Sequence, residues 1–409
     1  MLDSYSPEEA TSRDPHIDAP SATVVELFAG AGGLATGLHQ AGFEILDIIE
    51  SDESCCRTLR ANARHFGWKD QLDLQPHDVR RVGFSAYAGQ VTLLSAGAPC
   101  QPFSRGGNRR GRHDDRDMFP EVVRAIAECQ PRAFVIENVR GLLFHDSINY
   151  LESIMARLRN PTASDPSTPG SEDVYHLRAP KPSRHDAYRV ERCVMDAADF
   201  GLAQHRPRLF IVGLAQGESE FRWPVGNHSR ASLIEDLRGD AYWEDHPGLP
   251  KAVIARARAR LPKQSLRRRG ERWRTLRDIT ATLGPPATTE ARAAFSWHVH
   301  VPGARLYGRH TGSRIDWVAK TVKAGVHGSP GGEHILVTSP CRFRYLTVRE
   351  CAELQGFPRD YVLPEKRTPA MRQLGNAVPV AVAKALGLQI RACLNDKSDL
   401  GNPPLHDYQ

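Results

Sequence analysis

Short apolar runs alternate with helix-like stretches through the first half of the chain. Residues 24–28 (Val-Val-Glu-Leu-Phe) and 43–49 have the composition of buried strands, and residues 34–41 between them have the pattern of a helix. Three further apolar runs predict strands of the same sheet, at residues 91–95, 134–136 and 208–212. Strands that alternate with helices in this way predict an α/β fold.

The pattern changes after Gly213. From residue 214 to about residue 340, Trp, Arg, Gly and Pro are irregularly spaced, which predicts a second domain inserted into the first. Helical α/β character returns at residues 346–355 and 377–394. Asn376 is expected to cap the last helix, with Pro379 in its first turn. We expect this helix to pack back on the first domain.

These changes in pattern divide the chain into successive parts. Residues 159–186 are rich in Pro, Ser, Thr and Asp, which predicts an exposed insertion within the first domain. The predicted parts are a flexible arm (1–22), a core (23–213), an inserted domain (214–340), a return to the core (341–394) and a tail (395–409).

Composition limits the class of protein. The chain has 409 residues, too many for one small core, and its 40% hydrophobic and 25% charged residues are ordinary for a soluble globular protein. No long apolar run predicts a membrane span, and the first 22 residues have no hydrophobic signal core. The eight cysteines form no Cys-x-x-Cys pair, so we expect reduced cytoplasmic thiols and no metal site.

Positive charge is concentrated in one segment. The net charge is only +6, but residues 251–277 contain eleven Lys and Arg against one acid, Glu271. This run fits either a solvated basic helix face or a surface that contacts nucleic-acid phosphates. In the second case the contacts are expected from Arg267, Arg268, Arg269, Arg272 and Arg274.

A glycine-rich turn follows the first predicted strand. Gly30, Gly32 and Gly33 lie between that strand and the helix, and Glu50 ends the next strand about twenty residues later. Nucleoside-binding sheets have this arrangement, in which the acid accepts hydrogen bonds from ribose hydroxyls. The spacing Gly-x-Gly-Gly differs from the dinucleotide fingerprint and favours a smaller adenosyl ligand.

A cysteine follows the predicted strand at residues 91–95. Pro99-Cys100-Gln101 is placed where open α/β sheets bind ligands, outside the carboxyl ends of their strands. A free cysteine is more often a buried small hydrophobe than a nucleophile, so this motif is a weak signal by itself.

Six short motifs in order together resemble the cytosine-5 DNA methyltransferases, over residues 24–213 and 345–390. They are residues 28–33 (Phe-Ala-Gly-Ala-Gly-Gly), 99–101 (Pro-Cys-Gln), 137–139 (Glu-Asn-Val), 204–208 (Gln-His-Arg-Pro-Arg), 355–358 (Gln-Gly-Phe-Pro) and 375–378 (Gly-Asn-Ala-Val). The resemblance implies an α/β fold: a Rossmann-like S-adenosylmethionine-dependent methyltransferase core with a smaller irregular target-recognition domain.

The resemblance also implies catalytic roles. Cys100 would add to ring carbon 6 of cytosine, which makes carbon 5 nucleophilic. Glu137 would protonate ring nitrogen 3, so burial should raise its pKa. Arg208 would hold the carbonyl oxygen of the base and orient Glu137, and Arg206 and Gln101 would support the site.

The implied methyl donor is S-adenosyl-L-methionine, with S-adenosyl-L-homocysteine as product. Phe28 would pack on adenine, Glu50 would bind ribose, and Asp78 would accept from the adenine amino group. Asn376 would lie near the methionine end. The same resemblance assigns further residues to this site: Ala29, Gly30, Gly32, Gly33, Leu34, Ser51, Val79, Pro99 and Ala377. Ser51 departs from the family, which often has a bulky apolar residue there.

The implied substrate is double-stranded DNA, and its target base must be flipped out of the helix. Residues 104–117 would close over that base, with phosphate contacts from Arg105, Arg109, Arg110 and Arg112. Gln101 and Ser104 would support the flipped strand. The resemblance to bacterial modification enzymes implies that the chain protects host DNA from a restriction endonuclease that reads the same site. We expect a cytoplasmic monomer that acts without a membrane or an obligatory protein partner.

Three alternatives remain open. The tRNA-methylating branch of the family carries a Cys-Phe-Thr signature, which is absent from this chain. A catalytically inactive DNA-binding relative is opposed by the presence of Cys100, Glu137 and Arg208. A cysteine hydrolase would need a histidine base near Cys100, and it leaves the glycine turn, Glu50 and Asp78 without a role.

Overall fold

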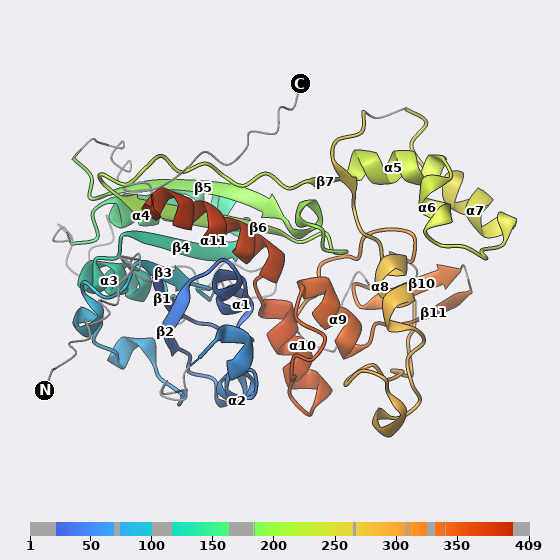
Figure 1. The fold of residues 1–409 in the computed structure, drawn as a ribbon, viewed down its shortest axis with the longest axis horizontal. Coiled ribbons are helices and arrows are strands. Elements are labelled where there is room, and N and C mark those ends of the chain that lie inside the picture. The colour runs from blue at the N-terminus through green and yellow to red at the C-terminus, as the bar shows by residue number, and fades with distance from the viewer. Residues whose placement is uncertain are drawn as a thin grey trace, which may run out of the picture.

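The predicted strands form a six-stranded sheet, which Figure 1 shows at the centre of the larger lobe. The computed structural model describes residues 22–68, 74–99, 117–162, 183, 185–264, 267–306, 308, 311–324, 332–339 and 341–395. The predicted arm and tail, and most of the predicted insertion at 159–186, lie outside these residues. The α/β fold predicted from the sequence is confirmed.

The sheet has the order β2-β1-β3-β4-β6-β5. Its strands are β1 (Thr23–Leu27), β2 (Glu44–Ile49), β3 (Leu93–Ala96), β4 (Ala133–Val139), β5 (Tyr188–Asp196) and β6 (Pro207–Ala215). Neighbours from β2 to β4 pair in parallel, whereas β6 pairs antiparallel with both β4 and β5. The carboxyl ends of β1, β3 and β4 therefore meet at one edge, beside the beginning of β6.

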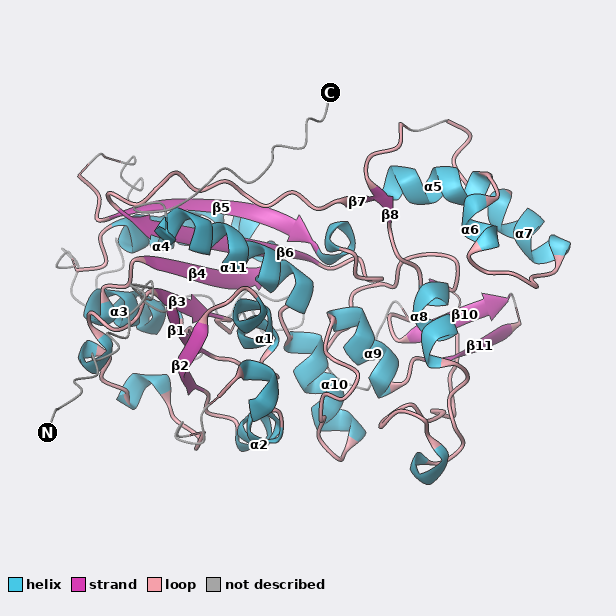
Figure 2. Ribbon diagram, viewed as in Figure 1, coloured by secondary structure: helices cyan, strands magenta, loops and turns pink. Residues whose placement is uncertain are grey.

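Helices cover both faces of the sheet, as Figure 2 shows. They are α1 (Gly33–Gln40), α2 (Glu53–Ala61), α3 (Phe119–Cys129), α4 (His145–Arg159) and, from the end of the chain, α11 (Val380–Asn395). Val24 of β1 lies in the apolar core with α1 and α11, while Val25 lies in the core with α3 and α4. Successive strand residues point to opposite faces, so each strand contributes to both cores.

Strand β5 was missed by the sequence pattern, which predicted helix and the exposed insertion at 159–186, but no strand, between the runs at 134–136 and 208–212. It lies at the edge of the sheet, where one side of the strand needs no partner. Its polar residues Arg189 and Glu191 are exposed, so β5 lacks the continuous apolar run that marks a buried strand.

The end of the chain forms two helices where one was predicted. Asn376 is the last residue of α10 (Arg367–Asn376), and α11 begins only at Val380. The prediction that Asn376 caps the last helix and that Pro379 lies in its first turn is therefore wrong. The stretch Arg367–Leu394 is long and apolar enough to cross a membrane, but 61% of its apolar window is buried within the protein. It is a core helix pair, and α11 packs against α1.

The inserted segment carries small elements and an apolar core of its own around Leu237, Tyr242 and Trp243. Its elements are β7 (His228–Ser229), α5 (Arg230–Arg238), α6 (Ala241–Glu244), α7 (Lys251–Arg258), β8 (Glu271–Arg272), α8 (Leu276–Leu283), β9 (Ser313–Arg314), β10 (Ile335–Ser339) and β11 (Arg342–Tyr345). The predicted boundary between residues 340 and 341 separates β10 from β11, which pair antiparallel. The return to the core therefore begins later, with α9 (Val348–Gln355).

Candidate active site

A cavity of about 330 Å³, partly open to solvent, lies at the edge where β1, β3 and β4 end. Segments far apart in the sequence line it: the turn after β1, the end of β2, the ends of β3 and β4, the start of β6 and the end of α10. The predicted site residues in its lining are Phe28, Ala29, Gly30, Leu34, Glu50, Ser51, Pro99, Glu137, Arg206, Arg208, Asn376 and Ala377.

The glycines of the first turn have different roles. Gly30 (φ 58°) lines the cavity, and a Cβ atom there would meet nothing within 4 Å. At Gly33, a Cβ atom would lie 2.2 Å from the carbonyl oxygen of Val378. Gly32 and Gly33 lie outside the lining, so they allow close packing of the protein rather than close approach of a ligand.

Glu50 is held by the backbone around it. Its Oε2 accepts from the N–H of Gly30 at 2.8 Å, and its Oε1 accepts from Ser51 and Asp52, each at 2.8 Å. A carboxylate has about four acceptor positions, so roughly one remains for a ligand. The sequence suggested that this acid accepts from both ribose hydroxyls, whereas the structure leaves room for one such bond.

Asp78 and Val79 lie outside the lining of the cavity. The Asp78 carboxylate pairs with Arg80 at 2.6 Å, and hydrogen bonds from Arg80 lower the pKa of Asp78 to about 2. The loop is still tied to the end of β2, because the N–H of His77 donates to the carbonyl oxygen of Glu50 at 2.7 Å. Asp78 is thus near the cavity but already has a cationic partner.

Two buried polar residues of the lining were missed by the sequence analysis. Glu26 in β1 is 1% exposed and its Oε2 has no hydrogen-bond partner in the described structure. Burial, and next the charge of Glu50, raise the pKa of Glu26. Gln373 is 2% exposed and its Oε1 also lacks a partner there. An acid inside the apolar run at 24–28 was the available signal for Glu26.

Glu137 and Arg208 form a buried pair at the end of β4. The Arg208 Nε atom lies 3.1 Å from Oε1 of Glu137, and both side chains are close to 10% exposed (13% and 9%). Burial raises the pKa of Glu137, and the nearby charges of Arg208 and Arg206 only partly oppose this effect. The antiparallel pairing of β4 with β6 sets Arg208 opposite Val139, two residues from the acid.

Arg206 is buried and bonds to backbone rather than to a carboxylate. It is 1% exposed, and its guanidinium donates to the carbonyl oxygens of Val322, Gly375 and Ala377, each at 2.8 Å. Gly375 and Ala377 flank Asn376 at the end of α10. Arg206 therefore joins β6 to the inserted segment and to the cavity wall, which is a positioning role.

Asn138, next to Glu137, also positions the site. Its Nδ2 donates to the carbonyl oxygen of Ala98 at 3.2 Å. This bond fixes the backbone after β3 against the end of β4, immediately before Pro99.

The predicted residues Cys100, Gln101, Ser104, Arg105 and Arg109 lie outside the described residues, as does nearly all of the predicted loop at 104–117.

Part of the predicted basic run is paired with acids of the protein. Arg268 pairs with Asp236 at 2.6 Å, and Arg272 pairs with Asp278 at 2.8 Å and with Asp245 at 2.9 Å. All three acids lie outside residues 251–277, so a count of charges along that run did not include them. The prediction of phosphate contacts from Arg268 and Arg272 is therefore not supported by their surroundings. Arg267, Arg269 and Arg274 have no carboxylate partner among the described residues.

Comparison with known proteins relates the chain to one family. The family described as "C-5 cytosine-specific DNA methylase" matches residues 22–161 and 183–392. The chain is 32% identical to the Type II methyltransferase M.NgoMIV of Neisseria gonorrhoeae over 385 residues, which covers 92% of this chain and 99% of that protein. It is 31% identical to the Type II methyltransferase M.Eco47II of Escherichia coli over 376 residues, 90% of this chain and 78% of that protein.

Solved structures share the fold. The chain resembles the Dnmt2 methyltransferase of S. pombe with a TM-score of 0.54 and 16% identity, over 91% of this chain and 99% of that one. It resembles a prophage-encoded methyltransferase of E. coli, titled a putative DNA modification enzyme, with a TM-score of 0.50 and 18% identity, over 92% of this chain and all of that one (100%).

Proposed function

The chain belongs to the C-5 cytosine-specific DNA methylase family, and from this premise we propose that it methylates DNA cytosine through Cys100, Glu137 and Arg208. Cytosine-5 methyltransferase activity on DNA follows from the family and from relatives that are named Type II methyltransferases. The observation that supports the assignment of residues is the buried Glu137–Arg208 pair at the cavity edge, 3.1 Å apart.

Glu137 has the protonation behaviour that the reaction needs. A general acid works best when its pKa is near the operating pH, and burial moves the pKa of Glu137 upward toward that range. Arg208 holds the carboxyl group in place through its Nε atom. Its remaining N–H groups can donate to the carbonyl oxygen of a bound cytosine.

In the proposed reaction the Cys100 thiolate adds to ring carbon 6. The electron pair of the ring double bond moves toward ring nitrogen 3, where Glu137 supplies a proton, and carbon 5 becomes nucleophilic. After the methyl group reaches carbon 5, the proton on carbon 5 passes to solvent and its bonding electrons re-form the double bond to carbon 6, which expels the Cys100 thiolate. Ring nitrogen 3 returns its proton to Glu137, and the aromatic ring is restored. Asn138 holds the backbone that leads to Cys100, two residues after the Ala98 carbonyl.

The lining of the cavity fits S-adenosyl-L-methionine, which supplies a methyl group on a positively charged sulfur. Phe28 offers an aromatic face for adenine, and Glu50 offers an acceptor for a ribose hydroxyl. The buried acceptors without partners, on Glu26 and Gln373, suit a ligand that carries hydroxyl and ammonium donors. Asp78 would reach the adenine amino group from the adjacent loop.

Several finer statements belong to the same proposal. The target cytosine is flipped out of the duplex, and Gln101, Ser104, Arg105 and Arg109 support the displaced strand and its phosphates. The similarity to Type II methyltransferases suggests that methylation protects DNA from a restriction endonuclease with the same site. The enzyme then acts as a cytoplasmic monomer close to the DNA.

One assay tests the proposed substrate. Radiolabelled methyl donor is incubated with the protein and duplex plasmid DNA, tRNA or no nucleic acid. Label in the DNA that maps to carbon 5 of cytosine supports the proposal. Label in tRNA alone, or incorporation without any nucleic acid, would contradict it.

Glu50→Ala is expected to weaken binding of S-adenosyl-L-homocysteine by about 1–3 kcal/mol, the usual cost of leaving buried hydrogen-bond partners unpaired. Titration calorimetry measures this change. Glu53→Gln, on α2 and outside the cavity lining, is the matched control and should bind normally. Thermal melting verifies that both variants fold, and unchanged affinity in Glu50→Ala would show that the cofactor binds elsewhere.

A further inference from the structure

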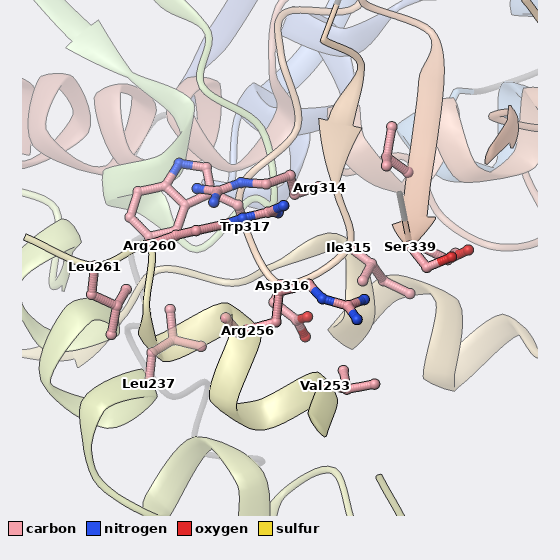
Figure 3. A pocket seen from close by; sticks show the side chains of 13 residues that line it. Leu237, Val253, Arg256, Arg260, Leu261, Arg314, Ile315, Asp316, Trp317 and Ser339 are labelled. Atoms are coloured by element: carbon pink, nitrogen blue, oxygen red, sulfur yellow. The ribbon is translucent and has the colours of Figure 1, made fainter. Parts of the chain in front are cut away.

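A basic hollow, partly open to solvent, lies in the inserted segment, between α7 and the small sheet of β9 and β10. Arg256 lies near the end of α7, Arg260 follows the helix, and Arg314 lies in β9. Figure 3 shows these side chains and Trp317 in the lining of the hollow, with Arg260 and Arg314 drawn beside the indole ring. We refer to the hollow lined by Arg256, Arg260, Arg314 and Trp317 as the arginine pocket.

The protein only partly balances the positive charge of the arginine pocket, because the charge of Asp316 acts on Arg314 less strongly than burial and Arg260 do. Among the described residues, Arg256, Arg260 and Arg314 have no ion-pair partner. Asp316 is the acid of the lining, and it already pairs with Arg277 at 2.5 Å. Burial, and next the positive charge of Arg260, lower the pKa of Arg314. Like charges held this close repel each other, so the pocket is suited to an anion.

Trp317 forms an aromatic wall of the pocket and holds a guanidinium in place. The Cζ atom of Arg314 lies 5.6 Å from the centroid of the indole ring, and the Cζ atom of Arg230 lies 5.8 Å from it. Such stacking restrains the guanidinium of Arg314 but leaves its N–H groups free to donate. A restrained guanidinium loses less entropy when it binds a phosphate oxygen.

The chain segment that carries Arg314 also contacts the residues that lead into β6. The chain that carries Arg314 continues to Ala319, whose carbonyl oxygen accepts from the N–H of His205 at 2.9 Å. Three residues later the Val322 carbonyl oxygen accepts from Arg206 at 2.8 Å. An anion bound at Arg314 is thus held on the same segment that positions the start of β6. This continuity favours the DNA substrate itself over an unrelated anion.

We propose that the arginine pocket, rather than the Arg267–Arg274 run, is the main DNA phosphate site of the inserted segment. This inference rests on the proposed function, because it takes DNA as the substrate. The two sites differ in their arrangement. Arg256, Arg260 and Arg314 line one hollow together with Trp317. In the run, Arg268 and Arg272 are paired with acids, and Arg267 and Arg269, unpaired among the described residues, line neither of the two cavities described above.

The test compares two double variants with the same change in charge. Arg256→Gln/Arg260→Gln removes two exposed arginines of the pocket, and Arg267→Gln/Arg269→Gln removes two exposed arginines of the run. Binding to a fluorescein-labelled 30-base-pair duplex of mixed sequence is measured by anisotropy over a salt series. Each lost phosphate contact should reduce the slope of log affinity against log salt by about 0.9.

For the pocket variant we expect weaker binding and a slope reduced by about 1.8, two contacts at about 0.9 each. For the run variant we expect a slope close to that of the wild type. Equal slopes in both variants, or a larger reduction in the run variant, would overturn the inference. Inorganic phosphate alone is titrated as a free anion. If phosphate binds tightly to the wild-type protein while the pocket variant binds DNA as the wild type does, the inference is also overturned.

Two further measurements separate this inference from the proposed function. Wild-type protein that neither binds the duplex nor methylates plasmid DNA would contradict the proposed function. If the wild-type protein does both and the pocket variant binds the duplex with the same affinity and salt dependence, only the assignment of the arginine pocket is contradicted. Affinity for S-adenosyl-L-homocysteine should be the same in all three proteins, because the two cavities share no lining residue.

Discussion

Cys100→Ala is expected to abolish methyl transfer to DNA, with a loss on the order of 10⁴-fold or more, the scale on which removal of a covalent nucleophile acts. Without the thiolate, carbon 5 of cytosine remains a poor nucleophile, whatever the other residues do. The variant should still bind the methyl donor and DNA. Radiolabel incorporation into plasmid DNA measures the rate.

The matched control for this variant is Cys341→Ala, which removes an exposed cysteine of the inserted segment and should keep full activity. A duplex that carries 5-fluorocytosine gives a second readout, because fluorine cannot leave from carbon 5 as a proton does. Wild-type protein should become covalently attached to this duplex, while Cys100→Ala should not. Appreciable turnover by Cys100→Ala would refute the assignment.

Glu137→Gln is expected to lower kcat by about 10²–10⁴-fold, the usual contribution of a positioned general acid. The wild-type rate should fall at high pH as Glu137 loses its proton, since burial has raised its pKa above the usual 4.5. Glutamine cannot lose a proton in this range, so that decline should be absent in the variant. Rates of methyl transfer across a pH series measure both effects.

The same pKa shift predicts a change in stability. Because the pKa of Glu137 is raised in the folded protein, its neutral form favours folding, and this contribution is lost as pH rises from about 4.5 through the folded-state pKa. The melting temperature of Glu137→Gln should therefore improve relative to the wild type as pH rises. Glu244→Gln, an exposed site on α6, is the control and should change neither the pH–rate profile nor the pH dependence of melting. A normal kcat in Glu137→Gln would exclude Glu137 as the acid.

The sequence predicted secondary structure most reliably where the local pattern of apolar residues matches a single helix or strand. The strand, glycine turn, helix and strand predicted for residues 24–49 are β1, α1 and β2. β1 is buried along its whole length, and β2, although it lies at an edge of the sheet, has four apolar residues of six (Glu-Ile-Leu-Asp-Ile-Ile). Both runs are therefore easy to recognise. The edge strand β5 and the helix α10 were missed, because both are rich in polar residues and leave little apolar signal.

The candidate site was predictable as a set of residue types but not as an arrangement. The motifs placed Glu50, Glu137 and Arg208 at the ends of strands, and the order of strands brings them to one cavity. No sequence pattern indicated that the guanidinium of Arg206 donates to backbone carbonyl oxygens, or that Gly33 packs against the carbonyl oxygen of Val378. Both contacts join residues more than one hundred positions apart, which periodicity cannot register.

By itself, the sequence determined the α/β class, the family and the chemistry at the ends of the strands. Each of these depends on local patterns or on short motifs in a fixed order. Only the tertiary structure decided which charges remain available, because neutralisation depends on distance in space. Arg272 lies in the most basic run of the chain yet is paired with Asp278 and Asp245, whereas Arg314, outside that run, lies unpaired beside Trp317.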